Sequence, residues 1–468
     1  MKIRLFILTI TFGFVFSKAY SQGNDMNEQV KFHNLNTSIL NLYKQFPIVA
    51  VGEGQHNSAL TFEWLTTLIN EAEFPIVVNN IVVEFGASEY QWVMDAFVNG
   101  EDVPDSLFKK CWRETTQILV WDNPIYEKFF REVRTINNKL PKQKRIRILL
   151  GDPSFGSKEI HDEHSFHIIE NEVLKKGQTA LLIYGDLHLI RKDVFTNYAD
   201  PKVVKKEFLN VIQFLEIHYP GKAFSIWGSV NTTDSLTNKL LEAENIQAPA
   251  LVHTNSSQLG NLDFRAFYPY STEFRTDSIG NDIETSQHIQ MPMKNIVDGI
   301  IFRGSWEQQN YLAPKPDNIY ADTIYLNELI RREQILNIPP YRTRLYFYKI
   351  SGSKHFSPFE IALKTGDVEK IDSLYLPLKK QIPQAKENEV LNYTGHFFLR
   401  NNEVIEAINV FKLGIREHPD AFYFYDGLGD AYLTINEKDN AVKFYEEALL
   451  RNPNNKLIKG KLDKAKTM

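Results

Sequence analysis

Short apolar runs that end in glycine or an acidic residue recur through the first two thirds of the chain. The first run, Ile48–Val51, leads into Gly52-Glu53-Gly54-Gln55-His56, and residues 58–70 then carry apolar side chains at helical spacing. Further runs of this kind stand at Ile81–Gly86, Ile146–Leu150, Ala180–Tyr184, Ala223–Trp227, Ala250–His253 and Gly299–Phe302. Strands that alternate with helices predict an α/β domain, with a mostly parallel sheet flanked by helices.

Ionisable side chains stand where several of these runs end. The set comprises Glu53, His56, Glu84, Asp152, Asp186 and His188. The carboxyl ends of parallel strands meet at one edge of a sheet, so we expect residues far apart in sequence to converge there. Two histidines with carboxylates can act as general base and acid, or they can hold a divalent metal. The residue types alone leave both interpretations open.

Three of these strand ends also carry a family resemblance. The segments 52–56 (Gly-Glu-Gly-Gln-His), 83–86 (Val-Glu-Phe-Gly) and 184–188 (Tyr-Gly-Asp-Leu-His) resemble the erythromycin esterase-like proteins and the related haem-binding-uptake (ChaN-like) and Tiki superfamily. The likeness covers about residues 45–305, including Trp121…Arg134-x-x-Asn137 and the run 297–302.

The resemblance implies a hydrolase of the erythromycin esterase type. His56 would be the general base that activates water against an ester or related acyl substrate, with Glu53, Glu84 and His188 as catalytic partners. No cofactor is required on this interpretation. The ChaN-like branch implies instead a haem- or metal-binding protein, with His56, Glu84 or His188 as ligands. A third possibility is a non-catalytic interaction scaffold.

The sequence departs from the esterase pattern at two places. Gly185 occupies the position of the first histidine in the His-Asn-x-His pair that esterases usually carry. The arginine expected shortly after the His56 position is absent, and Arg113 is a candidate to supply that positive charge. We expect Arg113, Asp152 and Asp186 to have supporting or substrate-binding roles.

Three histidines spaced three apart, His161, His164 and His167, form a further candidate site. This spacing can place them on one side of a helix, where they could bind a metal. Their neighbours Asp162, Glu163 and Ser165 are more typical of a solvated helix.

The N-terminus resembles a secretory signal peptide. Lys2 and Arg4 precede an apolar run, Leu5–Phe16, and the small residues Ala19 and Ser21 predict cleavage before Gln22. The run is shorter than the roughly 20 residues of a membrane-spanning helix. We therefore expect residues 1–21 to be removed, and the mature chain to be periplasmic or extracellular without a membrane span.

Composition narrows the remaining function classes. The chain has 468 residues, enough for two or three domains, and its formal charge of −5 comes without a basic tract, which argues against nucleic-acid binding. Cys111 is the only cysteine, so an internal disulfide and a cysteine-based zinc site are excluded.

The C-terminal region contains a 34-residue repeat. Pairs of glycine, alanine, proline and aromatic residues recur at this period, as in the tetratricopeptide (TPR) helix-turn-helix unit. They are Gly395 and Gly429, Phe398 and Tyr432, Ala407 and Ala441, Phe411 and Tyr445, and Pro419 and Pro453.

We expect an α/β domain over 28–350 and a small helical domain over 356–468, with repeats at about 388–421 and 422–455. Two repeats are few for a free-standing solenoid, so either 356–390 or the α/β domain must cover one face. The repeats predict a protein partner or self-association, and the strand ends a small-molecule substrate or ligand.

Overall fold

The computed structural model describes residues 31–191, 209–268, 291–313, 322–335, 358–380, 387–400 and 403–467, except positions 119, 231, 233 and 310. The chain forms two compact units, residues 1–314 and 315–468. This division falls before the boundary near residue 350 that the sequence predicted. The signal peptide predicted over 1–21 lies outside the described residues.

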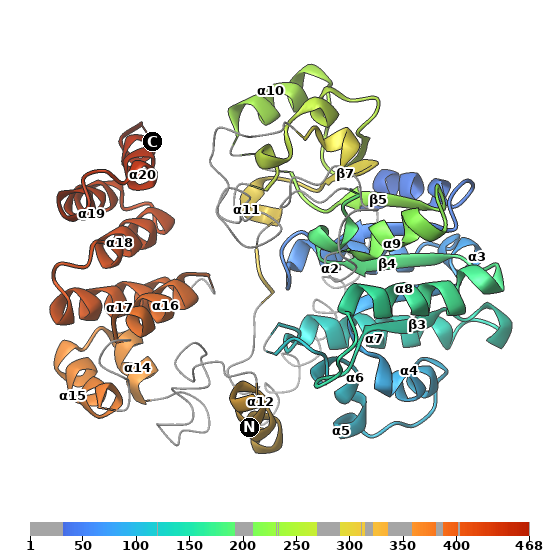
Figure 1. The fold of residues 1–468 in the computed structure, drawn as a ribbon, viewed down its shortest axis with the longest axis horizontal. Coiled ribbons are helices and arrows are strands. Elements are labelled where there is room, and N and C mark those ends of the chain that lie inside the picture. The colour runs from blue at the N-terminus through green and yellow to red at the C-terminus, as the bar shows by residue number, and fades with distance from the viewer. Residues whose placement is uncertain are drawn as a thin grey trace, which may run out of the picture. The chain divides into compact units, whose positions relative to one another are not determined.

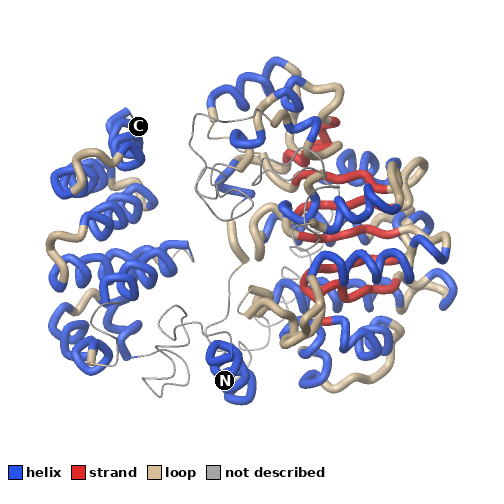
Figure 2. Tube along the Cα trace, viewed as in Figure 1, coloured by secondary structure: helices blue, strands red, loops and turns tan. Residues whose placement is uncertain are grey.

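The first unit is built on one sheet, which Figure 2 shows between helices. Its strands are β1 (Ile48–Gly52), β2 (Asn80–Ala87), β3 (Arg147–Asp152), β4 (Ala180–Tyr184), β5 (Ala223–Trp227), β6 (Ala250–His253) and β7 (Gly299–Phe302). Their order is β3-β2-β4-β1-β5-β7-β6. All described pairs are parallel except β6 with β7. The predicted fold class, a mostly parallel sheet flanked by helices, is confirmed.

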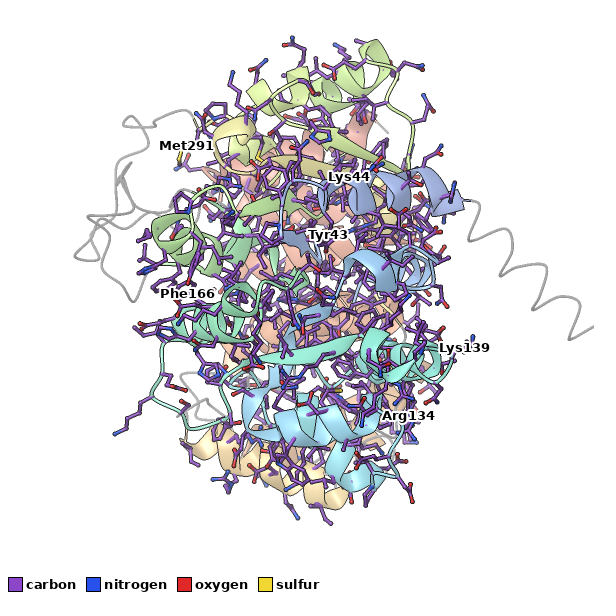
Figure 3. All side chains as sticks on the ribbon, turned by 90° about the vertical axis from the view of Figure 1, so that its right-hand side faces the viewer. Tyr43, Lys44, Arg134, Lys139, Phe166 and Met291 are labelled. Atoms are coloured by element: carbon purple, nitrogen blue, oxygen red, sulfur yellow. The ribbon has the colours of Figure 1, made fainter. Side chains whose placement is uncertain are left out.

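Alternating side chains of each strand serve two separate cores. Val49 and Val51 face one core, whereas Ile48 and Ala50 face the other. The first core includes helices α2 (Ala59–Ile69), α4 (Gln91–Val98) and α7 (Pro124–Asn137). The second includes α8 (His161–Glu172) and α9 (Val211–His218), where Phe166 stacks on Phe214 at 5.6 Å between ring centroids. Figure 1 labels these helices, and Figure 3 labels Phe166 on α8. Helices therefore cover both faces and leave the strand ends as the place for a site.

Shorter elements complete the first unit. Residues 31–42 are helical, and the further helices are α3 (Phe74–Val77), α5 (Asp105–Phe108), α6 (Lys110–Arg113), α10 (Ser235–Ala243) and α11 (Trp306–Gln309). The 3₁₀ helices are η1 (Ser88–Tyr90), η2 (Lys142–Lys144), η3 (Leu174–Lys176), η4 (Asp186–Leu189), η7 (Gln258–Asn261), η8 (Phe264–Ala266) and η11 (Met293–Asn295).

The region 255–295 is rich in Asn, Ser and Thr with few periodic apolar positions, which predicts long loops near the sheet edge that partly cover the site. Where this region is described, it contains the short helices η7, η8 and η11. Leu259, Phe264 and Met293 are buried in one cluster with Trp227 of β5 and Ile300 of β7. These apolar anchors lack helical or strand periodicity, which is why the sequence pattern missed them. Residues 269–290 lie outside the described residues, and the predicted covering of the site stays a prediction.

The second unit is a helical, repeat-like domain. Its helices are α12 (Thr323–Ile335), α14 (Pro358–Thr365), α15 (Val368–Lys379), α16 (Glu387–Arg400), α17 (Val404–Glu417), α18 (Phe422–Thr434), α19 (Lys438–Arg451) and α20 (Lys456–Thr467). The pairs α16–α17 and α18–α19 coincide with the two predicted repeats. Helices α14 and α15 share a core with α16, α17 and α18, so the segment after residue 356 covers one face of the repeats.

Glycines let the repeat helices approach aromatic rings. A Cβ built at Gly429 of α18 would lie 2.4 Å from the ring of Tyr445 on α19, and one at Gly395 would lie 2.3 Å from Phe411. These are equivalent pairs of the 34-residue period. The repeated glycines thus stand where only a hydrogen atom fits between two helices.

Gly429→Ala is expected to lower the free energy of unfolding of this unit by about 1–3 kcal/mol, because the added methyl group collides with a buried ring. Gly460→Ala on α20 is the matched control, since its Cβ would meet nothing within 4 Å. The control should gain about 0.5–1 kcal/mol of helix propensity. Urea unfolding followed by circular dichroism measures both. Equal stability of the two variants would contradict the close approach.

Candidate functional site

Three strand ends meet around Gly185, the residue that follows β4. A Cβ built at this glycine would lie 3.1 Å from His56 Cε1, 3.3 Å from Glu84 Oε2 and 3.5 Å from His188 Cδ2. The three side chains therefore lie close together around this one point. The strand order explains the meeting, because β4 lies between β2, which carries Glu84, and β1, which precedes His56. The structure brings together the residues that the sequence proposed as catalytic.

Glu53 and His56 form one half of this group. The Glu53 side chain is fully buried, and its Oε2 lies 3.6 Å from His56 Nδ1. Neither carboxylate oxygen of Glu53 makes a hydrogen bond of ordinary geometry to another described residue. Burial raises the pKa of Glu53, although His56 opposes that shift. Burial lowers the pKa of His56, but Glu53 and Glu84 outweigh this effect and raise it overall.

Trp121 holds the His56 ring from the side. The two rings meet edge to face, with centroids 4.5 Å apart. Trp121 also packs on Phe85 of β2, and the Asn57 N–H after His56 donates to the Tyr126 hydroxyl at 3.1 Å. Trp121, before α7, and Tyr126, in α7, thus fix the turn after β1. The His56 side chain remains partly exposed.

Glu84 and His188 form the other half. The Gly185 N–H donates to Glu84 Oε2 at 2.6 Å, and Glu84 Oε1 lies 3.3 Å from His188 Nε2. Burial raises the pKa of Glu84, but the neighbouring histidines outweigh it and hold that pKa well below its usual range. Burial lowers the pKa of His188, but Glu84 and Asp162 raise it well above its usual value. Each member of the pair therefore favours the charged form of the other.

A second histidine, His161, lies beside His188 at the start of α8. The two rings have centroids 5.1 Å apart. His161 Nε2 lies 3.0 Å from Asp152 Oδ1, and Asp152 is held by the Thr116 N–H at 2.7 Å. Burial lowers the pKa of His161, but Asp152 and Asp162 outweigh it and raise it to about 10. Asp152, predicted as a supporting residue, therefore acts on the group through His161.

Asp186 lies with a buried arginine on the other side of β1. Its Oδ1 accepts the Gly228 N–H at 2.8 Å, and burial raises its pKa to about 6, although Arg303 lowers it. Arg303, directly after β7, donates to the carbonyl oxygens of Gly228 and Glu53. Burial lowers the pKa of Arg303 to about 10, against the charges of Asp186 and Glu53.

Arg303 is a cation that sequence reasoning missed. Arg113, the residue predicted to supply the missing positive charge, is the last residue of α6 and half-buried. Arg303 reaches the backbone of Glu53 from a strand end 250 residues later. Its position directly after the late strand was the available signal, because β7 is parallel to β5 and therefore ends at the same edge of the sheet.

The three histidines of α8 separate into different environments. His161 faces the site, whereas His164 Nε2 lies 2.8 Å from the Ser88 hydroxyl and Nδ1 2.8 Å from Glu159. The His167 side chain is 54% exposed. A spacing of three residues rotates each histidine further round the helix, so the three do not share one site.

A group that could hold a metal ion comprises His161, Asp162 and His188, whose ligand atoms lie within 4.8 Å of one another. Within the described part of the chain, this set differs from the predicted one of His56, Glu84 and His188, and only His188 is common to both. The reason is that Glu84 faces the Gly185 N–H and His188 Nε2, while His188 Nδ1 faces Asp162.

Comparison with known proteins finds similar solved structures but no family. No known protein family matches the chain, and no curated protein matches it. A crystal structure of a succinoglycan biosynthesis protein aligns over 57% of this chain and 89% of that chain, at 9% identity and a TM-score of 0.39. The P58(IPK) TPR domain aligns over 32% of this chain and 44% of that chain, at 21% identity and a TM-score of 0.18. The erythromycin esterase-like resemblance stays a prediction.

Fold and site together define an α/β protein with a buried histidine–carboxylate cluster at its strand ends, followed by a helical TPR-like domain. Among the residues that the structure describes, no helix has the length and apolar character to cross a membrane.

Proposed function

We propose that the chain is an exported hydrolase that uses His56 to activate water against an ester or related acyl substrate. The observation that carries the proposal is the meeting of His56, Glu84 and His188 around Gly185. A general base must reach its water within hydrogen-bond distance, and a second group must serve the developing negative charge. His56 and His188 can serve as these two groups, because their rings lie 3.1 and 3.5 Å from a Cβ built at Gly185.

The charges suggest a role for each residue. Glu53 orients His56 through Nδ1 and stabilises the imidazolium that forms when His56 takes a proton from water. His188, kept protonated by Glu84 and Asp162, stabilises the oxyanion or donates a proton to the leaving group. Glu84 also fixes the Gly185 backbone through its N–H.

The haem-binding alternative is less well supported by the same contacts. Both nitrogens of His188 face carboxylates, Nδ1 at 2.7 Å from Asp162 Oδ1 and Nε2 at 3.3 Å from Glu84 Oε1. A haem iron at His188 would have to displace one of them. These contacts favour a proton or a small cation at His188.

Assays on a panel of chromogenic esters and macrolide lactones test the proposal, with Gly185→Val as the decisive variant. Backbone angles of φ −58° and ψ 142° accept valine at position 185, so the change removes no ionisable group but pushes a side chain against His56, Glu84 and His188. We expect hydrolysis to fall by about 100-fold, because displacing reacting groups by an ångström has effects of that size.

Gly460→Ala, in the other unit, is the control and should hydrolyse like the parent. Absence of hydrolysis by the parent chain on every ester and lactone would refute the hydrolase proposal. Unchanged hydrolysis by Gly185→Val would place the reaction away from Gly185.

A further inference from the structure

Asp162 lies between two histidines that present the same ring nitrogen to it. Its Oδ1 is 2.7 Å from His188 Nδ1, and its Oδ2 is 3.8 Å from His161 Nδ1. Asp162 is also fixed by the Val211 N–H, which donates to Oδ1 at 3.0 Å. Two imidazole nitrogens and a carboxylate thus converge on a small volume, with one ligand atom of each within 4.8 Å of the others.

The opposite nitrogen of each ring faces a second, buried carboxylate. His188 Nε2 lies 3.3 Å from Glu84 Oε1, and His161 Nε2 lies 3.0 Å from Asp152 Oδ1. Histidines that bind metals usually direct their other N–H at a carboxylate, which fixes the tautomer and makes the ligating nitrogen more basic. Both rings have a carboxylate at ion-pair distance from this other nitrogen, although neither contact has ordinary hydrogen-bond geometry.

The outer carboxylates are themselves held in place. Glu84 accepts the Gly185 N–H, while Asp152 accepts the N–H and the hydroxyl of Thr116 at 2.7 and 2.8 Å. A mere surface cluster of acids would not show two ordered shells around two histidines. The backbone of Gly185, after β4, thus holds Glu84, and the backbone of Thr116, after α6, holds Asp152.

We propose that His161, Asp162 and His188 bind one divalent transition-metal ion. Two nitrogens and one oxygen suit zinc or manganese, whereas magnesium and calcium prefer oxygen ligands throughout. On binding, the ion displaces the protons from the Nδ1 atoms of His161 and His188, and its positive charge then offsets the carboxylates of Glu84, Asp152 and Asp162, which lie in and around the set. Three protein ligands leave at least one position for water, as in catalytic rather than structural zinc sites.

This inference shares His188 with the proposed hydrolase, but it concerns binding and is tested without any substrate. The purified chain is stripped with EDTA and titrated by calorimetry with zinc, manganese and magnesium chloride. Binding of one zinc or manganese ion per chain, with little or no magnesium binding, is the expected result.

Variants separate the site from adventitious binding. His161→Gln removes a ligand and should weaken zinc binding by more than 100-fold, while Asp152→Asn removes an outer partner and should weaken it by about 10–100-fold. His167→Gln, on the exposed side of the same helix, should bind like the parent. Circular dichroism of the EDTA-treated variants checks that each is folded.

Cobalt substitution gives a readout that a structural role would not produce. Cobalt(II) bound by two imidazoles and a carboxylate shows visible absorption bands, which His161→Gln should shift or abolish. Equal zinc affinity of His161→Gln and the parent, or the absence of any bound ion, would overturn the proposal. If hydrolysis by the EDTA-treated chain persists in that case, the hydrolase proposal still stands.

Discussion

His56→Ala is expected to lower kcat/KM for any ester that the parent chain hydrolyses by about 10²–10⁴-fold, the usual contribution of a positioned general base. The alanine leaves Glu53 buried without the imidazole that faces it at 3.6 Å, and it removes the ring that Trp121 supports. His188, whose ring also lies beside Gly185, has a pKa that Glu84 and Asp162 raise well above its usual value, so we do not expect it to replace His56 as the base. Initial rates with chromogenic esters measure the loss.

The pH profile provides a check that does not depend on the size of that loss. His56 works as a base only when neutral, and its pKa is raised above 6.5 because Glu53 and Glu84 outweigh the effect of burial. The acid limb of kcat/KM should therefore lie above pH 6.5. Glu53→Gln removes the partner that raises this pKa most, so the limb of its residual activity should move to lower pH.

The matched control for both measurements is His167→Ala. This histidine is on α8 in the same unit, but its side chain is 54% exposed, pairs with Glu163 and Glu170 and contacts the Phe166 ring. It should retain the parental rate and pH profile. If His56→Ala hydrolyses as fast as the parent, His56 is not the base, whatever the effect of blocking position 185.

The fold was predictable because its strands are short apolar runs, and several of them end at a glycine or are directly followed by one. Ala180–Tyr184 and Ala223–Trp227 begin and end where the sequence placed them, since buried parallel strands read as uninterrupted apolar runs. The direction of β6 was not available from the sequence, because a four-residue run at a sheet edge has the same pattern in either direction. Tertiary contacts of the region 255–295 were equally hidden.

The site was predictable only in part, for a physical reason. Glu53 directly follows β1, Glu84 lies in β2 beside the end of β4, and His188 follows β4 in η4, so sheet geometry brings them together. His161 and Asp162 stand on the same helix as exposed His167, and the composition of the whole segment is typical of a solvated helix. Only the packing of α8 beside β3 and β4 shows that one turn of this helix faces His188.

Glu84→Gln is expected to lower the free energy of unfolding of the metal-free first unit by about 1.5–3 kcal/mol at neutral pH, because it removes one of the two carboxylates that face buried His188 while Asp162 remains. Glutamine can still accept the Gly185 N–H through its amide oxygen, so the backbone contact survives. What disappears is the charge that faces His188 at 3.3 Å. Urea unfolding of EDTA-treated protein measures the difference.

The pH dependence distinguishes a lost charge from a packing defect. The pKa of Glu84 is lower in the folded chain than its ordinary value of 4.5, so its stabilisation is present above pH 4.5 and is lost as the pH falls toward the folded pKa. The difference between Glu84→Gln and the parent should shrink correspondingly below pH 4.5. If the variant had a packing defect instead, the difference in unfolding free energy would be the same above and below pH 4.5. Glu63→Gln is the control: its exposed pair with Lys31 at 3.1 Å should contribute less than about 1 kcal/mol, because water screens such pairs.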